Sequence, residues 1–347
     1  MRKLFMVSPY SVSVCMSMLA EGSDDVVRAN MIKALLGREA TVDELSELMK
    51  LMSESLVDVD NTVQFKESNS VWYDNKVVIG GDFSKAVSRY FNAPSYQCDM
   101  YSDQSTRQIN DWVKDATENL IGKIFEEGAI PRTNAMLANA VYFRGLWSEP
   151  FDVSLTSKAC FTNASGKNVT VEMMSGQIDR NGGIADGVKV VHLPYGNNAF
   201  SMTVILPDGP VDEFVASLTP ESWKKLRYLV SNSRILVKIP RFTIGCDGLL
   251  LNDALKSIGF ESNFAKGTSY DRICDDLPGN LLKVRHSAIL KVDEAGSEAA
   301  AVTSAGWFST QTNPDGTIDF TADRPFIFVI DEISTGAILF AGVVNEM

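Results

Sequence analysis

The residues able to do covalent chemistry are few in this chain of 347 residues. Nucleophilic catalysis by a serine or cysteine needs a general base, and only two histidines are present, His192 and His286. The sequence contains no G-x-S-x-G, H-E-x-x-H, Walker A or G-x-G-x-x-G element. The five cysteines are widely spaced and form no C-x-x-C pair, which predicts free thiols rather than a disulfide framework or a zinc site. The sequence therefore argues against an enzyme.

A different kind of chemistry is suggested by the segment that follows Glu294, which reads EAGSEAAAVTSAGWFSTQTNP. Between Gly296 and Ala305 the only bulky side chain is Val302. About 30 residues separate two strongly apolar segments here, which is longer than most structureless loops and is typical of a functional or disordered loop. The alternative is a short helix over the EAAA run, limited to about two turns by the flanking glycines and serines. Such small side chains could also enter between two strands without overpacking.

Composition limits the partners. The net charge is −12, which disfavours a nucleic-acid or anionic-membrane partner. The longest apolar runs, such as 337–344, are too short to span a bilayer. Arg2 and Lys3 precede the apolar run LFMV, as in a signal peptide. However, Ser8, Pro9 and the serines after them interrupt that run and favour a structural segment.

The hydrophobic pattern predicts helices in the first part of the chain and strands in the second. A Thr-x-x-Glu capping box opens a helix over 41–55, and apolar spacing predicts further helices over 11–20, 105–127 and 250–260. Alternating or continuous apolar runs predict strands over 63–73, 136–143, 234–242 and 281–294. They also predict two strand runs around a Gly-Asn-Asn turn over 188–207 and a final hairpin over 325–344. No linker divides the chain. We therefore expect one α+β domain over 1–347, with large antiparallel or mixed sheets.

Six short motifs in order give the chain a resemblance to the serpins, the serine-protease-inhibitor-fold family. No single motif is specific, but their joint occurrence along nearly the whole chain is. They are Ser8-Pro9-Tyr10-Ser11, the block Asn139 to Trp147 with Pro150-Phe151, Leu193-Pro194-Tyr195, Leu206-Pro207-Asp208, the hinge-like Glu294 to Thr303, and Asp323-Arg324-Pro325-Phe326 with Gly336 to Val343.

The resemblance implies a fold of three β-sheets with about eight to nine helices and an exposed reactive-centre loop, here about 295–322. It also implies inhibition of a serine protease. The protease attacks the loop, and the cleaved loop inserts into the main sheet as a new strand while the acyl-enzyme is trapped. The implied partner is therefore a protease in a covalent acyl complex with a monomeric, extracellular protein that needs no cofactor and no metal. The alternative is a non-inhibitory serpin that acts as a binding or carrier protein.

The resemblance also assigns structural roles to individual residues. A polar cluster beneath the main sheet, called the shutter, matches Ser8, Ser11, Asn139 and His286, and the top of the sheet, called the breach, matches Trp147. The hinge, whose small side chains favour an inhibitory serpin, matches Glu294, Gly296, Ser297, Glu298, Ala299, Ala300, Ala301, Val302 and Thr303. In an inserted strand, alternate residues from Ser297 onward would face the core.

The resemblance leaves two choices for the position of the reactive bond. The family spacing counted from Glu294 gives Thr310–Gln311, whereas a count back from Pro325 gives Pro314, so the loop is longer than the commonest one. Thr310–Gln311 is the first choice and Phe308–Ser309 the second. No Lys or Arg occurs between Lys291 and Arg324, which excludes a trypsin-like target, whose pocket needs a cation. Thr310 favours an elastase-like or subtilisin-like target, and Phe308 a chymotrypsin-like one.

The chain also departs from the family pattern in two ways. It begins almost at Ser8, so the helix of some 25–30 residues that usually precedes this point in the family is expected to be missing. The helix predicted over 41–55 has an acidic exposed face, without the basic cluster of heparin-activated members. We therefore expect no activation by heparin or related glycosaminoglycans.

Overall fold

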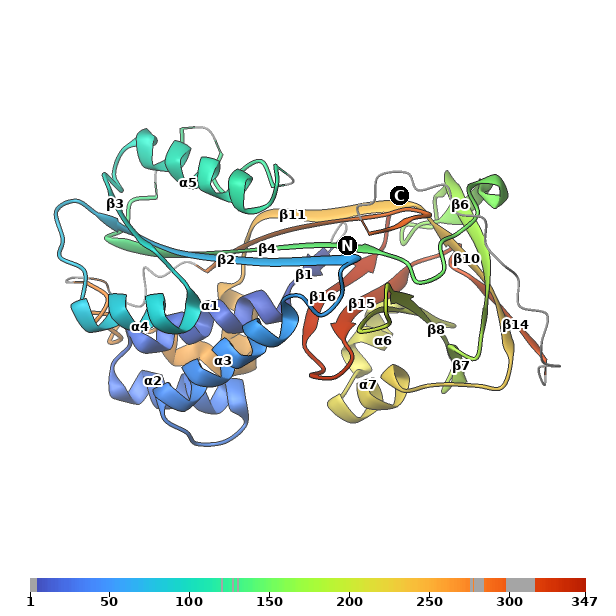
Figure 1. Cartoon of the computed structure of the whole chain (residues 1–347), viewed down its shortest axis with the longest axis horizontal. Helices are drawn as coiled ribbons and strands as arrows, with labels where there is room; N and C mark the ends of the chain where they lie inside the picture. The colour runs from blue at the N-terminus through green and yellow to red at the C-terminus, as the bar shows by residue number, and fades with distance from the viewer. Residues whose placement is uncertain are drawn as a thin grey trace.

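The computed structural model describes residues 5–119, 121–126, 128–129, 131–274, 277, 284–297 and 316–347. These residues form three sheets, with helices on both sides of the main sheet and beside the others (Figure 1). The helices are α1 (Pro9–Glu21), α2 (Asp25–Leu36), α3 (Val42–Leu56), α4 (Gly81–Phe91), α5 (Asp103–Ala116), α6 (Val211–Ser217), α7 (Pro220–Arg227) and the single turn α8 (Asn252–Leu255). None of the described helices is long and apolar enough to cross a membrane.

The main sheet has six strands in the order β11-β12-β13-β4-β2-β3. Helix α5 lies on one side of it, and α1 to α4 gather on the other (Figure 1). Its strands are β2 (Val63–Asp74), β3 (Ser95–Cys98), β4 (Ala135–Leu146), β11 (Phe242–Leu250), β12 (Arg285–Val292) and the two-residue β13 (Gly296–Ser297).

A second six-stranded sheet has the order β1-β16-β15-β9-β8-β7, and a four-stranded sheet has the order β14-β10-β6-β5. Strands β9 and β15 are buried at every residue, because both faces of this sheet are covered. The strands are β1 (Phe5–Val7), β7 (Gly182–Ala185), β8 (Val188–Tyr195), β9 (Phe200–Pro207), β15 (Phe326–Glu332) and β16 (Ile338–Val344), then β5 (Ser157–Thr162), β6 (Asn168–Asp179), β10 (Arg234–Pro240) and β14 (Thr317–Thr321).

The predicted α+β class with three sheets is confirmed, and most predicted elements exist. The capping box at the start of α3 is present: Glu44 donates its backbone N–H to Thr41 Oγ1, and its side chain accepts from the Thr41 backbone. This pair satisfies two amide groups that the first turn of a helix leaves without partners. The predicted hairpin over 325–344 corresponds to β15 and β16, which pair antiparallel.

Two predicted helices were wrong in extent. The helix expected over 105–127 ends at Ala116, because Glu118 and Asn119 adopt left-handed backbone angles, with φ of 51° and 67°. The Thr117 hydroxyl donates to the Val113 carbonyl and accepts the Ile121 N–H, which fixes the turn. The helix expected over 250–260 is regular only in α8, since Gly259 has a φ of 107° that a regular helix cannot contain.

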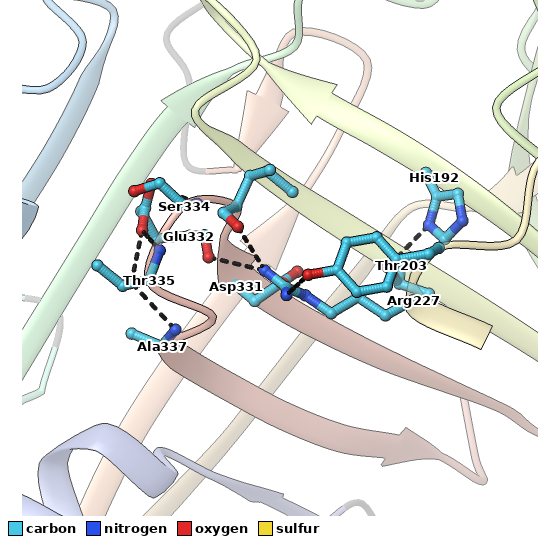
Figure 2. Close-up of polar contacts among 10 residues, drawn as sticks. His192, Thr203, Arg227, Asp331, Glu332, Ser334, Thr335 and Ala337 are labelled. Carbon is cyan, nitrogen blue, oxygen red and sulfur yellow. Dashed lines mark hydrogen bonds and ion pairs between the residues drawn. The ribbon is translucent and has the colours of Figure 1, made fainter. Parts of the chain in front are cut away.

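A buried ion pair attaches α7 to the hairpin of β15 and β16 (Figure 2). The Arg227 guanidinium pairs with the Asp331 carboxylate, whose side chain is almost fully buried. Arg227 Nη2 also donates to the carbonyls of Glu332 and Ile333, at 3.0 and 2.9 Å. One arginine thus satisfies the turn that would otherwise leave several acceptors unpaired.

Candidate functional site

The chain reverses direction directly after β12. The backbone N–H of Asp293 donates to the Gly296 carbonyl at 2.9 Å, and the Ala295 N–H donates to the Asp293 carboxylate at 3.0 Å. This tight turn sends β13 back between β12 and β4. There Ser297 lies opposite Val292 on one side and Gly145 on the other.

The space around position 296 admits only a glycine. Its φ is 153°, and a Cβ added there would lie 2.0 Å from the backbone oxygen of Gly145. Any other residue would therefore displace the backbone of β13 from β4. The glycine of the predicted hinge thus has a steric role at the point where the chain enters the sheet.

Ser297 is fully buried and is held by two aromatic residues. Its hydroxyl lies 2.6 Å from the Tyr195 hydroxyl, and the Tyr195 ring stacks on Trp147 at 4.4 Å between centroids. Trp147 in turn donates its indole N–H to the Asp293 carbonyl at 2.9 Å. Trp147 therefore contacts the turn itself. Its role in the breach, which the family resemblance implies, stays a prediction. Tyr195 was quoted only as part of a motif, and its contact with Ser297 was not foreseen.

Glu294 is fixed from the side of the four-stranded sheet. Its carboxylate pairs with the Arg241 guanidinium at 2.6 Å and accepts from the Thr156 hydroxyl at 2.5 Å. Burial raises the pKa of Glu294, but the hydrogen bonds from Arg241 and Thr156 outweigh it, so the net pKa lies below its usual range. The carboxylate is therefore ionised and anchors the first residue of the predicted hinge. Neither Arg241 nor Thr156 carried a signal in the sequence analysis.

Ser8, Ser11, Asn139 and His286 form one hydrogen-bonded cluster, although they lie far apart in the sequence. The Ser8 N–H donates to His286 Nε2 at 3.0 Å, the Ser11 N–H donates to Ser8 Oγ at 3.1 Å, and the Ser11 hydroxyl donates to Asn139. Asn139 then donates to Asn69 Oδ1 at 2.7 Å. The cluster therefore links α1 to β12, β4 and β2. Asn69 was missed because it is one of several polar residues in an alternating strand.

Burial determines the protonation of His286. It lowers the pKa of the imidazole to about 4, so the ring is neutral near pH 7. Since Nε2 accepts a hydrogen bond, the proton of the neutral ring is on Nδ1. His286 thus accepts a hydrogen bond within a buried polar cluster.

Within the described residues, β12 and β4 are joined only through β13. No ladder pairs them directly below Ser297 in this part of the chain. Side chains cover the junction instead: Ala140 of β4 and Ile289 of β12 belong to one apolar cluster with Val113 of α5. The main sheet thus has a junction between the long strands β4 and β12. The two residues of β13 occupy the upper end of this junction.

The rest of the predicted site lies outside the described residues. This applies to the hinge residues Glu298, Ala299, Ala300, Ala301, Val302 and Thr303 and to both candidate reactive bonds, Thr310–Gln311 and Phe308–Ser309. The roles assigned to these residues remain predictions.

Comparison with known proteins places this arrangement in a family. The family model described as Serpin (serine protease inhibitor) matches residues 2–347. Serpin-Z1A of Triticum aestivum is 30% identical, over 98% of this chain and 89% of the relative. Iripin-1 of Ixodes ricinus is 31% identical, over 98% and 88%. The chain belongs to the serpin family.

Solved structures agree with this assignment. The native state of the thermophilic serpin tengpin superposes with a TM-score of 0.89 at 25% identity, covering 100% of this chain and 89% of that one. A thyroxine-binding globulin complex with thyroxine superposes with a TM-score of 0.85 at 22% identity, covering 99% and 93%, which shows the fold alone. Serpins are generally protease inhibitors rather than enzymes.

Proposed function

We propose that this serpin inhibits a serine protease as a suicide substrate. The protease cleaves the loop that follows Ser297, and the new end of the loop enters the main sheet between β12 and β4 before the acyl-enzyme is hydrolysed. The inhibitor acts as an extracellular monomer, and its partner is the target protease in a covalent acyl complex. Distortion of the protease's oxyanion hole accounts for the trapped ester, because loss of one donor there already slows such chemistry by about 10²–10³.

The observation that carries the proposal is the position of β13. Ser297 already pairs with both neighbouring strands, and Glu298 and the small residues Ala299 to Ala301 follow it directly in the sequence. A strand that continued β13 along the junction would lie between the facing edges of β12 and β4. No described strand pairs with those edges there. The continued strand would also bury alternate side chains, which after Ser297 are Ala299, Ala301 and Thr303, none of them charged.

The expected target has a small or an aromatic-accepting specificity pocket. Thr310 before the cleaved bond suits an elastase-like or subtilisin-like protease, and Phe308 suits a chymotrypsin-like one. Lys and Arg are absent from 292–323, so a protease whose pocket holds a buried carboxylate is a poor target. The acidic exposed face of α3 argues against activation by heparin, since Asp43 and Glu44 occupy its first turn.

The second candidate function is that of a non-inhibitory carrier, since one protein of similar fold is named a thyroxine-binding globulin and was solved with thyroxine. Incubation with pancreatic elastase and, separately, chymotrypsin distinguishes the two. We expect a complex that survives denaturing electrophoresis, and a released C-terminal peptide whose mass corresponds to a start at Gln311 or Ser309. Clean cleavage without a complex, and without a rise in thermal stability afterwards, would instead favour the carrier.

A further inference from the structure

Helix α3 carries two leucines that the rest of the fold leaves exposed. Its buried side, formed by Leu45, Met49 and Leu56, packs on the core. Leu48 and Leu51 lie on the other side, with 39% and 54% of their surface accessible. Because they are three residues apart, they are neighbours along the helix and form a short apolar stripe. A single exposed leucine is common on a protein surface, whereas adjacent ones beside a hollow are typical of a contact surface.

This stripe belongs to a groove of about 540 Å³ between α3 and the end of α4. Tyr90 lines the groove from α4, and Asp43, Glu44 and Glu47 line it from α3. At about 3.6 residues per turn, Asp43 and Glu47 lie one above the other along one edge of the leucine stripe. The groove therefore combines an apolar floor with an acidic rim.

Two carboxylates of this rim are available to a partner. Arg38 pairs with Glu44 at 3.9 Å, and Glu44 also closes the capping box. Asp43 and Glu47 are exposed, and their carboxylates have no ion pair or hydrogen bond among the described residues. Arg89, whose guanidinium lies over the Tyr90 ring, pairs with neither of them. The segment 37–55 as a whole holds five acids and two bases, which are Glu39, Asp43, Glu44, Glu47 and Glu54 against Arg38 and Lys50.

We propose that this groove docks a basic amphipathic helix of a partner protein. The apolar side of that helix packs on Leu48, Leu51 and Tyr90, and lysine or arginine side chains beside it pair with Asp43 and Glu47. A helix is favoured over a strand because both walls of the groove are helices, whose backbone groups are already paired, so the groove offers side-chain packing. An acidic helix or an anionic lipid surface would be repelled by the rim.

The position of the groove separates this surface from the proposed inhibitory loop. In Figure 1, α3 and α4 lie toward the opposite end of the molecule from β14, the strand that follows the predicted reactive bond. A partner helix in the groove therefore leaves that end of the molecule accessible. Docking and protease inhibition can then be measured separately, and failure of one leaves the other intact.

The test uses the intact protein and a fluorescently labelled synthetic helix of leucine and lysine, with its leucines at every third or fourth position. Its counterpart carries glutamate in place of every lysine. Fluorescence anisotropy measures binding of each peptide, below the concentration at which the peptide associates with itself. We expect saturable binding of the lysine peptide only, and weaker binding as salt is added.

Two groove variants, each with a matched control, locate the binding. Asp43→Asn/Glu47→Gln removes both free charges and should weaken binding roughly fivefold, whereas Asp212→Asn/Glu213→Gln removes the same charges from α6 and should have no effect. Leu51→Ser should also weaken binding roughly fivefold, because about 1 kcal/mol of apolar burial is lost. Its control is Leu250→Ser, which changes a leucine of similar exposure, 51%, at the end of β11.

Three results would overturn the proposal. One is equal binding of the lysine and glutamate peptides to the parent protein. The second is a lysine peptide that binds both groove variants as tightly as it binds their controls. The third is another occupant: self-association of the protein, or binding to phosphatidylcholine vesicles, that Leu51→Ser abolishes and Leu250→Ser does not. All the changed residues are exposed, so each variant should unfold at the temperature of the parent protein, and a thermal melt checks this.

Discussion

Replacing Ser297 with arginine tests the central step of the proposed mechanism. In β13 the Ser297 side chain is fully buried, and its hydroxyl contacts Tyr195 at 2.6 Å. An arginine there must either bury its guanidinium, which costs several kcal/mol, or keep β13 out of the sheet. Leaving the sheet loses the bond to Tyr195 and the pairing with Val292 and Gly145, which is about 3 kcal/mol at roughly 1 kcal/mol for each of three bonds.

In the variant, position 297 has left the sheet and has to re-enter before the rest of the cleaved loop can follow, so the same cost applies at that step. A barrier raised by about 3 kcal/mol slows insertion roughly 150-fold. Deacylation then competes successfully, and Ser297→Arg should be cleaved as a substrate.

The assay titrates a fixed amount of pancreatic elastase with the inhibitor and measures residual activity and the denaturant-resistant complex. Ser297→Thr keeps a small uncharged side chain with a hydroxyl and should retain the complex. Ser55→Arg adds the same charge to the exposed side of α3 and should match the parent. If Ser297→Arg forms the complex at the stoichiometry of the parent protein, insertion does not need an uncharged residue at this position and the reasoning is wrong.

Two further predictions concern buried charges. The folded pKa of His286 is about 4 against roughly 6.5 for a free histidine, so the neutral ring contributes stability that is complete above about pH 6.5 and falls by up to about 3 kcal/mol as the pH drops toward 4. Urea unfolding of the parent and of His286→Gln at several pH values checks this, and equal pH slopes in the two proteins would contradict it. Arg227→Met should cost about 3–5 kcal/mol because it leaves the buried Asp331 carboxylate without its cation, and Arg227→Met/Asp331→Leu should recover part of that loss. A single variant as stable as the parent would show that the pair in Figure 2 is dispensable.

The sequence predicted the elements better than the contacts between them. Local signals sufficed for α3, whose capping box is read directly from Thr41 and Glu44, and for β2, whose residues alternate. Helix α5 was predicted too long because Glu118 and Asn119 are compatible with helical composition, while their left-handed backbone is set by the turn that Thr117 stabilises. Propensity alone does not contain that information.

At the candidate site, too, the sequence predicted individual residues better than the contacts between them. Motif resemblance named Ser8, Ser11, Asn139 and His286, which the fold brings into one cluster. It did not name Tyr195 or Arg241 as partners of Ser297 and Glu294, because those contacts join residues 102 and 53 positions apart and depend on how the sheets pack. Such pairings arise from tertiary structure, where no local pattern reports them.

The two residues of β13 have a kinetic consequence. Forming a new strand begins with a costly nucleation step, in which a flexible segment loses entropy before it gains many hydrogen bonds. Here Gly296 and Ser297 are already ordered against both neighbours, so that entropy has been lost during folding. In the proposed mechanism, insertion of the cleaved loop would then be propagation from an existing nucleus, and each added residue would gain pairing at once. Changes at Gly296 and Ser297 should therefore affect the onset of insertion, while changes further along the loop affect its rate of progress.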